Sequence, residues 1–314
     1  MLLNFLSTAS AKQLIAEPDT LAVLQFEDSL PADPTIPCSR VAQIADQVGL
    51  EVWKEVDGVV ERGVLGNCHW SRSEHLQFIA ISAPLSRPDD FEQTTLKAYD
   101  ELLSFIEKSP HVELIRFWNY IPHINHGAGD NENYKRFCSG RLAAFTQHDL
   151  QDQQFPAASA VGHYTDGITI YALTTNVTPV YHANPRQVDA FRYPREYGPS
   201  SPSFARACTV ELADQQLCFI SGTASILGHD SVHQGDLRLQ LYTTSDNILY
   251  LLQETGFQPE DIQTLRVYLR DPDDYLECKT IVEELYPKAT AIYAHADICR
   301  ADLLVEIECF CTSS

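Results

Sequence analysis

Apolar and polar residues alternate near the C-terminal end of the sequence, between positions 303 and 311. Glu306 and Glu308 fall on the same side of this alternation, which predicts a strand with two carboxylates on one face. The two would lie roughly 7 Å apart at about 3.3 Å per residue, so each makes the other harder to ionise, and burial would raise a pKa further. An outer sheet face with two solvated carboxylates is the alternative. The apolar side comprises Leu303, Val305, Ile307, Cys309 and Cys311.

The order strand, helix, strand is predicted twice along the chain. In the first occurrence the predicted elements are a strand at 76–82, a helix at 91–108 and a strand at 112–121. In the second they are a strand at 217–226, a helix at 240–255, a strand at 262–271 and a further helix at 275–285. Repetition of the same order favours one duplicated α+β unit over two unrelated domains.

Each predicted copy closes with a proline, a short strand, a turn and a final strand. Alignment of the two final strands on their turns puts Tyr171 at the place of Glu306. Because the copies differ at this position, we expect one functional site per chain.

The pattern divides the chain into four parts. Residues 1–65 are predicted to be an N-terminal extension packed on the first unit, with strands at 21–26 and 59–65 and a helix near 41–48. Residues 66–180 form the first unit, residues 181–207 connect the units, and residues 208–314 form the second unit.

The connecting segment is rich in proline and serine, which is typical of a linker. It is also the most basic stretch of an acidic chain. One interpretation is that its arginines bridge the domains through salt bridges, and the other is that the segment binds an anion. Its arginines and tyrosines are Arg186, Arg192, Arg195, Arg206, Tyr181, Tyr193 and Tyr197.

Composition limits the possible partners. The 43 acidic and 22 basic residues give a net charge of −21, which disfavours nucleic acid and anionic membranes as partners. No run of 18 apolar residues occurs, and the first residues lack the basic start of a signal peptide, so we expect a cytoplasmic protein. Nine cysteines without a CxxC pair predict reduced thiols rather than a disulfide framework or zinc site.

Metal binding is not expected. His123 and His126 have HxxH spacing but follow Pro122 at a predicted strand end, and no third ligand is evident. His229 and His233 lie on either side of Asp230 in what we interpret as a solvated polar loop.

Several long motifs resemble a known family. The strand ending in ISG, the TLRVYLRD strand, the YPKATA turn and the terminal LLVEIECF resemble the Rid (YjgF) family over roughly residues 208–314, and residues 67–175 resemble it more weakly. A duplicated Rid-like unit is similar to the chorismatases when it also carries NYIPHINHG, NENYKRFCSGR, PAASAVG, FRYPREYGPSSPSFARA and SGTASILGHDS. The resemblance implies two Rid-like domains with mixed sheets and helices packed on one face.

The resemblance also implies an activity. Chorismatases remove the enolpyruvyl group of chorismate as pyruvate without a cofactor, and a glutamate on the last strand donates and accepts the proton. Glu306 occupies that motif position. Some members have a cysteine seven residues earlier and form 3-hydroxybenzoate, whereas others form a dihydroxycyclohexadiene carboxylate. Cys299 stands at this place, which favours the first product, with an inert core thiol as the alternative.

Chorismate has two carboxylates, and arginine suits them because its planar fork can bond one carboxylate through two N–H groups. Structural pairing of these arginines with acidic residues is the alternative. The loop around Gly222 could supply backbone N–H groups. The predicted substrate-binding residues are Tyr134, Arg141, Tyr193, Arg195, Arg206, Gly222, Thr223 and Ala224.

Two other functions stay open at this point. One is a Rid-like metabolite-binding protein without chemistry, and the other is an imine deaminase. Rid deaminases resemble this chain less, because Thr290 and Ala291 stand where they place a substrate-binding arginine. A homo-oligomer is possible, since Rid units close as trimers.

Overall fold

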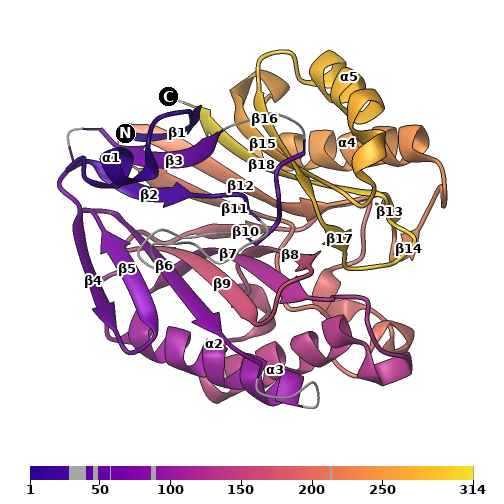
Figure 1. Ribbon diagram of the computed structural model, residues 1–314, viewed down its shortest axis with the longest axis horizontal. Coiled ribbons are helices and arrows are strands. Elements are labelled where there is room, and N and C mark those ends of the chain that lie inside the picture. The colour runs from indigo at the N-terminus through magenta and orange to yellow at the C-terminus, as the bar shows by residue number, and fades with distance from the viewer. Residues whose placement is uncertain (28–39, 45–48, 57, 86–89, 213, 314) are drawn as a thin grey trace.

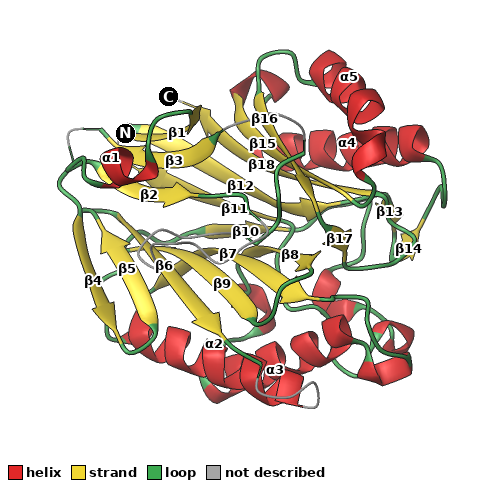
Figure 2. Cartoon of the chain, in the orientation of Figure 1, coloured by secondary structure: helices red, strands yellow, loops and turns green. Residues whose placement is uncertain are grey.

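The computed structural model describes residues 1–27, 40–44, 49–56, 58–85, 90–212 and 214–313. Two large sheets face each other in the middle of the molecule, and the long helices cover their outer faces (Figure 1). Figure 2 shows the same layers by element type, with strands in the centre and helices on either side.

The first large sheet has seven strands in the order β17-β8-β7-β9-β6-β5-β4. Strands β7 and β8 are parallel, and the other pairs are antiparallel, so the sheet is mixed. Helices α2 and α3 pack on its outer face through a shared apolar core. The elements are β4 (Glu61–Leu65), β5 (Cys68–Arg72), β6 (Leu76–Ala83), α2 (Phe91–Glu107), β7 (Glu113–Pro122), α3 (Asn133–Gln147), β8 (Ala157–His163) and β9 (Ile168–Thr175).

The second large sheet has six strands in the order β10-β11-β12-β18-β15-β16 and is also mixed, with β15 and β16 parallel. Helix α4 begins where the Asp236 side chain accepts a hydrogen bond from Leu239 N–H, and it ends at Gly256, whose φ of 80° suits glycine. The elements are β10 (Val180–His182), β11 (Ala207–Leu212), β12 (Gln215–Thr223), the short hairpin β13 (Ile226–Leu227) and β14 (Asp230–Ser231), α4 (Leu237–Thr255), β15 (Ile262–Leu269), α5 (Tyr275–Leu285), β16 (Thr290–His295) and β18 (Val305–Ser313).

The two sheets repeat one strand order. Read from their parallel pairs, β8-β7-β9-β6-β5-β4 corresponds to β16-β15-β18-β12-β11-β10. The facing surfaces of the sheets share one apolar core that includes Trp118, Tyr171, Phe219 and Phe310. The predicted α+β class, with mixed sheets and helices on one face of each, is confirmed.

One strand links the two units. The short strand β17 (Asp297–Ile298) follows the second unit's β16 but pairs with β8 of the first unit. Gly162 on β8 permits this approach, because an added Cβ would lie 2.7 Å from the Asp297 Cβ. The chain then returns to β18, so the turn after β17 lies between the units.

The N-terminal residues form a third sheet in the order β1-β3-β2, from β1 (Leu2–Ser7), β2 (Thr20–Leu24) and β3 (Leu50–Glu55), with a short helix α1 (Ala11–Ile15). We expected it to pack on the first unit. It contacts both: β2 lies against β5 and β6, and β1 lies against β15. Trp53 on β3 packs against Trp118 of the first unit and Phe310 of the second.

The prediction from the sequence was wrong for one N-terminal element. A helix was predicted near 41–48, but 41–44 is not helical, and Gln43 instead forms an isolated bridge with Ala294. Residues 45–48 lie outside the described residues. The apolar positions at Val41 and Ile44 that suggested a helix are buried in the cores of the large sheets, so tertiary packing decides this segment.

Within the described residues, every helix is too short or too polar to span a bilayer. The eight cysteines of the described part are all unpaired, in agreement with the predicted reduced thiols.

Candidate active site

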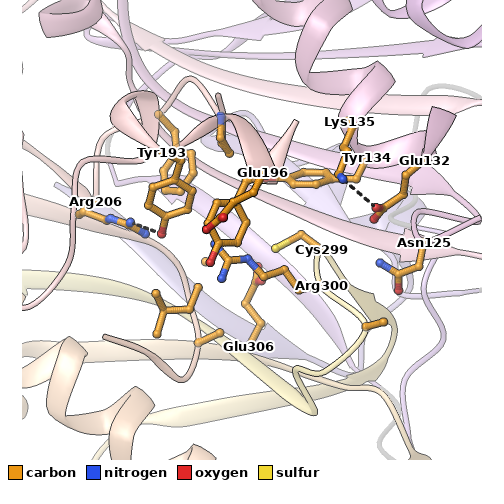
Figure 3. A pocket seen from close by; sticks show the side chains of 17 residues that line it. Asn125, Glu132, Tyr134, Lys135, Tyr193, Glu196, Arg206, Cys299, Arg300 and Glu306 are labelled. Carbon is orange, nitrogen blue, oxygen red and sulfur yellow. Dashed lines mark hydrogen bonds and ion pairs between the residues drawn. The ribbon is translucent and has the colours of Figure 1, made fainter. Parts of the chain in front are cut away.

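A cavity of about 300 Å³ opens between the two units. Its wall combines helix α3, the connecting segment, the end of β12, the turn after β17 and the start of β18. Figure 3 shows the side chains of Tyr193, Arg206, Cys299, Arg300 and Glu306 gathered around this space. The lining residues are Asn125, Glu132, Tyr134, Lys135, Tyr193, Glu196, Tyr197, Pro202, Phe204, Arg206, Gly222, Ala224, Ile226, Cys299, Arg300, Ala301 and Glu306.

Glu306 lies on β18 and is only 4% exposed, so the predicted strand is confirmed but a solvated outer face is excluded. Its carboxyl group lies against Gly222, where an added Cβ would be 2.1 Å from Glu306 Oε1. The pairing of β12 with β18 is irregular between Ile220 and Thr223, next to this contact. Irregular strand pairing is common beside active sites, where it redirects a side chain. Here it makes room for a carboxyl group.

The pKa values of the two glutamates of β18 are shifted in opposite directions. Burial, and then the negative charge of Glu308, raise the pKa of Glu306 to about 8, although Arg116 opposes this shift. Burial would also raise the pKa of Glu308, but the charges of Arg116 and Arg266 outweigh it and lower that pKa. At neutral pH Glu306 is therefore a neutral acid and Glu308 is a carboxylate.

Three donors converge on one oxygen of Glu308. Arg116 Nη2 lies 2.9 Å, Arg266 Nη1 lies 3.4 Å and Trp118 Nε1 lies 2.9 Å from Glu308 Oε2. Arg116 belongs to β7 of the first unit and Arg266 to β15 of the second, so the two units hold this carboxylate together. Glu306 Oε1 accepts no hydrogen bond from any described residue. The neutral acid is thus the less constrained of the two groups.

Arg206 and Arg300 supply positive charge to the cavity. Arg206 donates to the Tyr193 hydroxyl at 2.8 Å and to the Val188 carbonyl oxygen. Arg300 stacks on the Tyr197 ring, with its guanidinium carbon 4.0 Å from the ring centroid, and donates to the His229 carbonyl oxygen. Neither arginine forms a salt bridge within the described residues, so both can pair with an anionic ligand.

Cys299 lines the same cavity and follows directly after β17. Burial, and then the charge of Glu306, raise the pKa of the Cys299 thiol to about 12. The thiol is therefore protonated at neutral pH, which disfavours a thiolate nucleophile at this position.

The structure brings most of the predicted site residues together. Tyr134, Tyr193, Arg206, Gly222, Ala224, Cys299 and Glu306 all line the cavity. Thr223 does not, because its side chain is buried and donates to the Ser221 carbonyl oxygen.

Two of the three arginines that we predicted as carboxylate ligands lie outside the cavity wall. Arg195 is 66% exposed and pairs with Asp130, with contacts of 2.7 and 3.0 Å, which is the kind of pairing that the structural alternative predicted. Arg141 is fully buried and packs over the Phe137 ring, outside the cavity wall. Both residues occur in motifs of the family, but a motif does not say which face of its element points into the site.

Sequence reasoning missed Arg300, Lys135 and Glu196, and it named Tyr197 only as a tyrosine of the connecting segment. Arg300 directly follows Cys299, so this neighbour was the available signal. Glu196 also lies with His229 and Asp230 in an exposed group whose ligand atoms are within 4.8 Å of one another. Exposed groups of this kind are common without a metal ion, and we assign none to it.

The comparisons with known proteins agree with the fold. The family model described as chorismatase FkbO/Hyg5-like, N-terminal, matches residues 51–174, and the endoribonuclease L-PSP model matches residues 203–312. A crystal structure of a chorismatase superposes with a TM-score of 0.88 at 28% identity, covering 99% of this chain and 98% of that one. The two-unit fold is thus that of the chorismatase class.

Sequence relatives support the same assignment. A 3-hydroxybenzoate synthase from Streptomyces hygroscopicus is 34% identical over 291 residues, covering 88% of this chain and 84% of the relative. A chorismatase from Streptomyces rapamycinicus is 32% identical and covers 84% of this chain and 82% of the relative. This chain belongs to the chorismatase family, and the predicted family is confirmed.

Proposed function

We propose that this protein is a chorismatase that cleaves the enolpyruvyl ether of chorismate, releases pyruvate and forms 3-hydroxybenzoate. The observation that carries this proposal is a buried, neutral glutamic acid in a cavity with two arginines that form no salt bridge with any described residue. A metabolite-binding protein needs the arginines but has no use for the buried acid.

Binding of a doubly anionic ring requires fixed cations and donors. Arg206 and Arg300 provide the charges, and Lys135, which pairs weakly with Glu132 at 3.9 Å, also lines the cavity. Tyr134 and Tyr193 also line the cavity. Arginine suits carboxylates because two parallel N–H groups bond one carboxylate.

The chemistry begins at the terminal methylene carbon of the enol ether. Glu306 transfers its proton to this carbon, which leaves an oxocarbenium ion and the Glu306 carboxylate. Water adds to the cation, the hemiketal collapses, and pyruvate leaves. A pKa near the working pH suits a group that first donates and later accepts a proton, and exclusion of water favours carbon protonation.

The aromatic product requires loss of one water molecule from the ring. Addition of water at the ether and its loss from the ring balance, so chorismate yields pyruvate and 3-hydroxybenzoate with no net water. Cys299, as a neutral thiol beside Glu306, can relay a proton in this step. If it does not, a dihydroxycyclohexadiene carboxylate is released instead.

The test is incubation of the purified protein with chorismate, followed by chromatography and a pyruvate assay. We expect pyruvate and 3-hydroxybenzoate in equal amounts. Absence of pyruvate would reject the enzyme proposal and leave a binding protein. The variant Cys299→Ala should keep pyruvate release and shift the organic product towards the diene-diol, and an unchanged product would show that the thiol does not direct aromatisation.

An imine deaminase is not favoured. Thr290 and Ala291 lie at the start of β16 and do not line the cavity, so the substrate-binding position of Rid deaminases has no counterpart in its wall.

A further inference from the structure

The N-terminal sheet places a buried carboxylate behind the site. Glu51 on β3 has a side chain only 2% exposed, and its Oε2 lies 2.6 Å from Arg266 Nε. Its other oxygen accepts a hydrogen bond of 2.8 Å from Asn4 on β1. Two strands of this sheet therefore fix Glu51 against the second unit.

From Glu51 a continuous chain of charges leads to the site. Arg266 also contacts Glu308, which Arg116 holds from the opposite side. Glu308 is two residues from Glu306 on the same strand, so its carboxylate and that of Glu306 share a face. The four groups Glu51, Arg266, Glu308 and Arg116 carry two negative and two positive charges, and all are nearly inaccessible to solvent.

Four buried charges are costly to maintain. Replacement of a buried ion pair by apolar residues of similar volume is often neutral or stabilising, so a structural role alone is a weak explanation for the cluster. The cluster also lies among apolar rings: the Arg266 guanidinium carbon is 4.9 Å from the Trp118 ring centroid and 5.6 Å from that of Phe26.

We propose that Glu51 and Arg266 are positioning residues for the reaction: through Glu308 they fix the orientation and the charge environment of the Glu306 carboxyl group, which makes the N-terminal sheet a functional part of the active site. This inference rests on the proposed role of Glu306. No residue of the N-terminal sheet lines the cavity itself, so the effect acts through the cluster.

The sign of the effect follows from the groups around Glu306. Glu308 on its own strand favours the protonated form, and Arg116 on β7 opposes it. Tyr268 stands across the strand pair on β15, Cys299 lies beside the carboxyl group, and Arg206 and Arg300 line the same cavity. Loss of the Glu51 charge leaves the buried cluster with one uncompensated positive charge, which disfavours the proton on Glu306.

The test compares the variant Glu51→Gln with a matched control. Glu55→Gln makes the same change on the same strand, at a buried carboxylate that accepts a hydrogen bond from Ser73 and does not contact Arg266. In the wild type, kcat/KM should fall as Glu306 ionises near pH 8. We expect Glu51→Gln to move this fall to lower pH by roughly half a unit to one unit, whereas Glu55→Gln leaves it unchanged. Glu51→Asp, which keeps the charge, should leave the fall in kcat/KM close to its wild-type pH.

Two outcomes separate this inference from the proposed function. If Glu51→Gln lowers stability but leaves the pH profile of kcat/KM at the wild-type position, the cluster is only structural and the inference is overturned. If the wild type does not turn over chorismate, the protonation of Glu306 is followed instead by the ¹³C shift of its carboxyl carbon. A shift of that titration in Glu51→Gln, and not in Glu55→Gln, then supports the inference although the proposed function fails.

Discussion

The two units of this chain share a strand order but differ at the strand that carries the acid. In both units an arginine lies two residues before an aromatic residue on the central strand: Arg116 and Trp118 on β7, Arg266 and Tyr268 on β15. Trp118 stands opposite Tyr171, whereas Tyr268 stands opposite Glu306. The register therefore makes Tyr171 the equivalent of Glu306, as the alignment of the final strands predicted.

The strands next to this position also differ. In the first unit, β6 pairs with β9 in continuous register, and Ala80 lies opposite Tyr171. In the second unit, the β12 and β18 pairing is interrupted, and Gly222 faces the Glu306 carboxyl group. The two arginines around Glu308 thus occupy equivalent positions in the two units, whereas the acid and the irregular strand pairing beside it occur in the second unit. A single site at the contact of the two units follows.

The largest expected effect comes from replacing the two equivalent residues, Glu306 and Tyr171. Glu306→Gln should lower kcat by about 10³-fold, since a positioned general acid contributes roughly 10² to 10⁴. Tyr171→Phe, at the equivalent position of the first unit, should leave kcat within about twofold. The rate of pyruvate release from saturating chorismate measures both, and similar losses in the two variants would contradict the assignment of one site per chain.

The same two variants should also differ in how their stability changes with pH. Because the pKa of Glu306 is raised to about 8, the folded state holds a proton that the unfolded state releases near pH 4.5, so this group costs stability as the pH rises between these values. The free energy of unfolding of Glu306→Gln, relative to that of the wild type, should increase by up to about 4 kcal/mol between pH 4.5 and pH 8.5. Denaturant unfolding at several pH values measures this gain, and Tyr171→Phe, which removes no carboxyl group, should show a difference that does not vary with pH.

The space beside Glu306 can be tested with a single methyl group. Gly222→Ala should displace the carboxyl group and lower kcat by about 100-fold, because a misplacement of about 1 Å has effects of that size. Gly49→Ala is the control, since its added Cβ would meet only the end of the Gln43 side chain at 4.0 Å. Circular dichroism should show both variants folded. A kcat of Gly222→Ala equal to that of the wild type would mean that the position of the Glu306 carboxyl group does not depend on the missing side chain at Gly222.

The smallest expected effect distinguishes Arg300 from Arg195 as the ligand of a substrate carboxylate. Arg300→Met should raise KM for chorismate by roughly 10-fold or more, which corresponds to loss of about one charged hydrogen bond. Arg195→Met should change KM by less than about threefold, because an exposed pair with Asp130 is worth little. Steady-state kinetics decides between them, and a larger effect at Arg195 would restore the ligand role that the sequence suggested for it.

The sequence predicted the features that repeat along the chain. The helix at Tyr275–Leu285 was predicted with its observed bounds, and the duplicated strand order and the alternating last strand followed from apolar periodicity. Glu306 and Cys299 could be found because family motifs fix their spacing. Periodicity fails where contacts between distant segments decide the structure.

Two examples show why the rest was not predictable. Arg300 lies in a turn whose course depends on β17 joining the sheet of the other unit, and no local pattern reports that pairing. Glu51 lies in the predicted N-terminal extension and was not among the predicted site residues, yet it meets Arg266 across 215 positions of sequence. Such pairings follow from the packed arrangement of three sheets, which a single sequence does not reveal.

The most direct measurement is the pH titration of the Glu306 carboxyl group in the ligand-free protein, followed by its ¹³C carboxyl shift and assigned through the signal that Glu306→Gln lacks. We predict that Glu306 is neutral at pH 7 and ionises near pH 8, while Glu308 stays ionised across the same range. A Glu306 carboxylate that is already ionised at pH 6 would contradict the account.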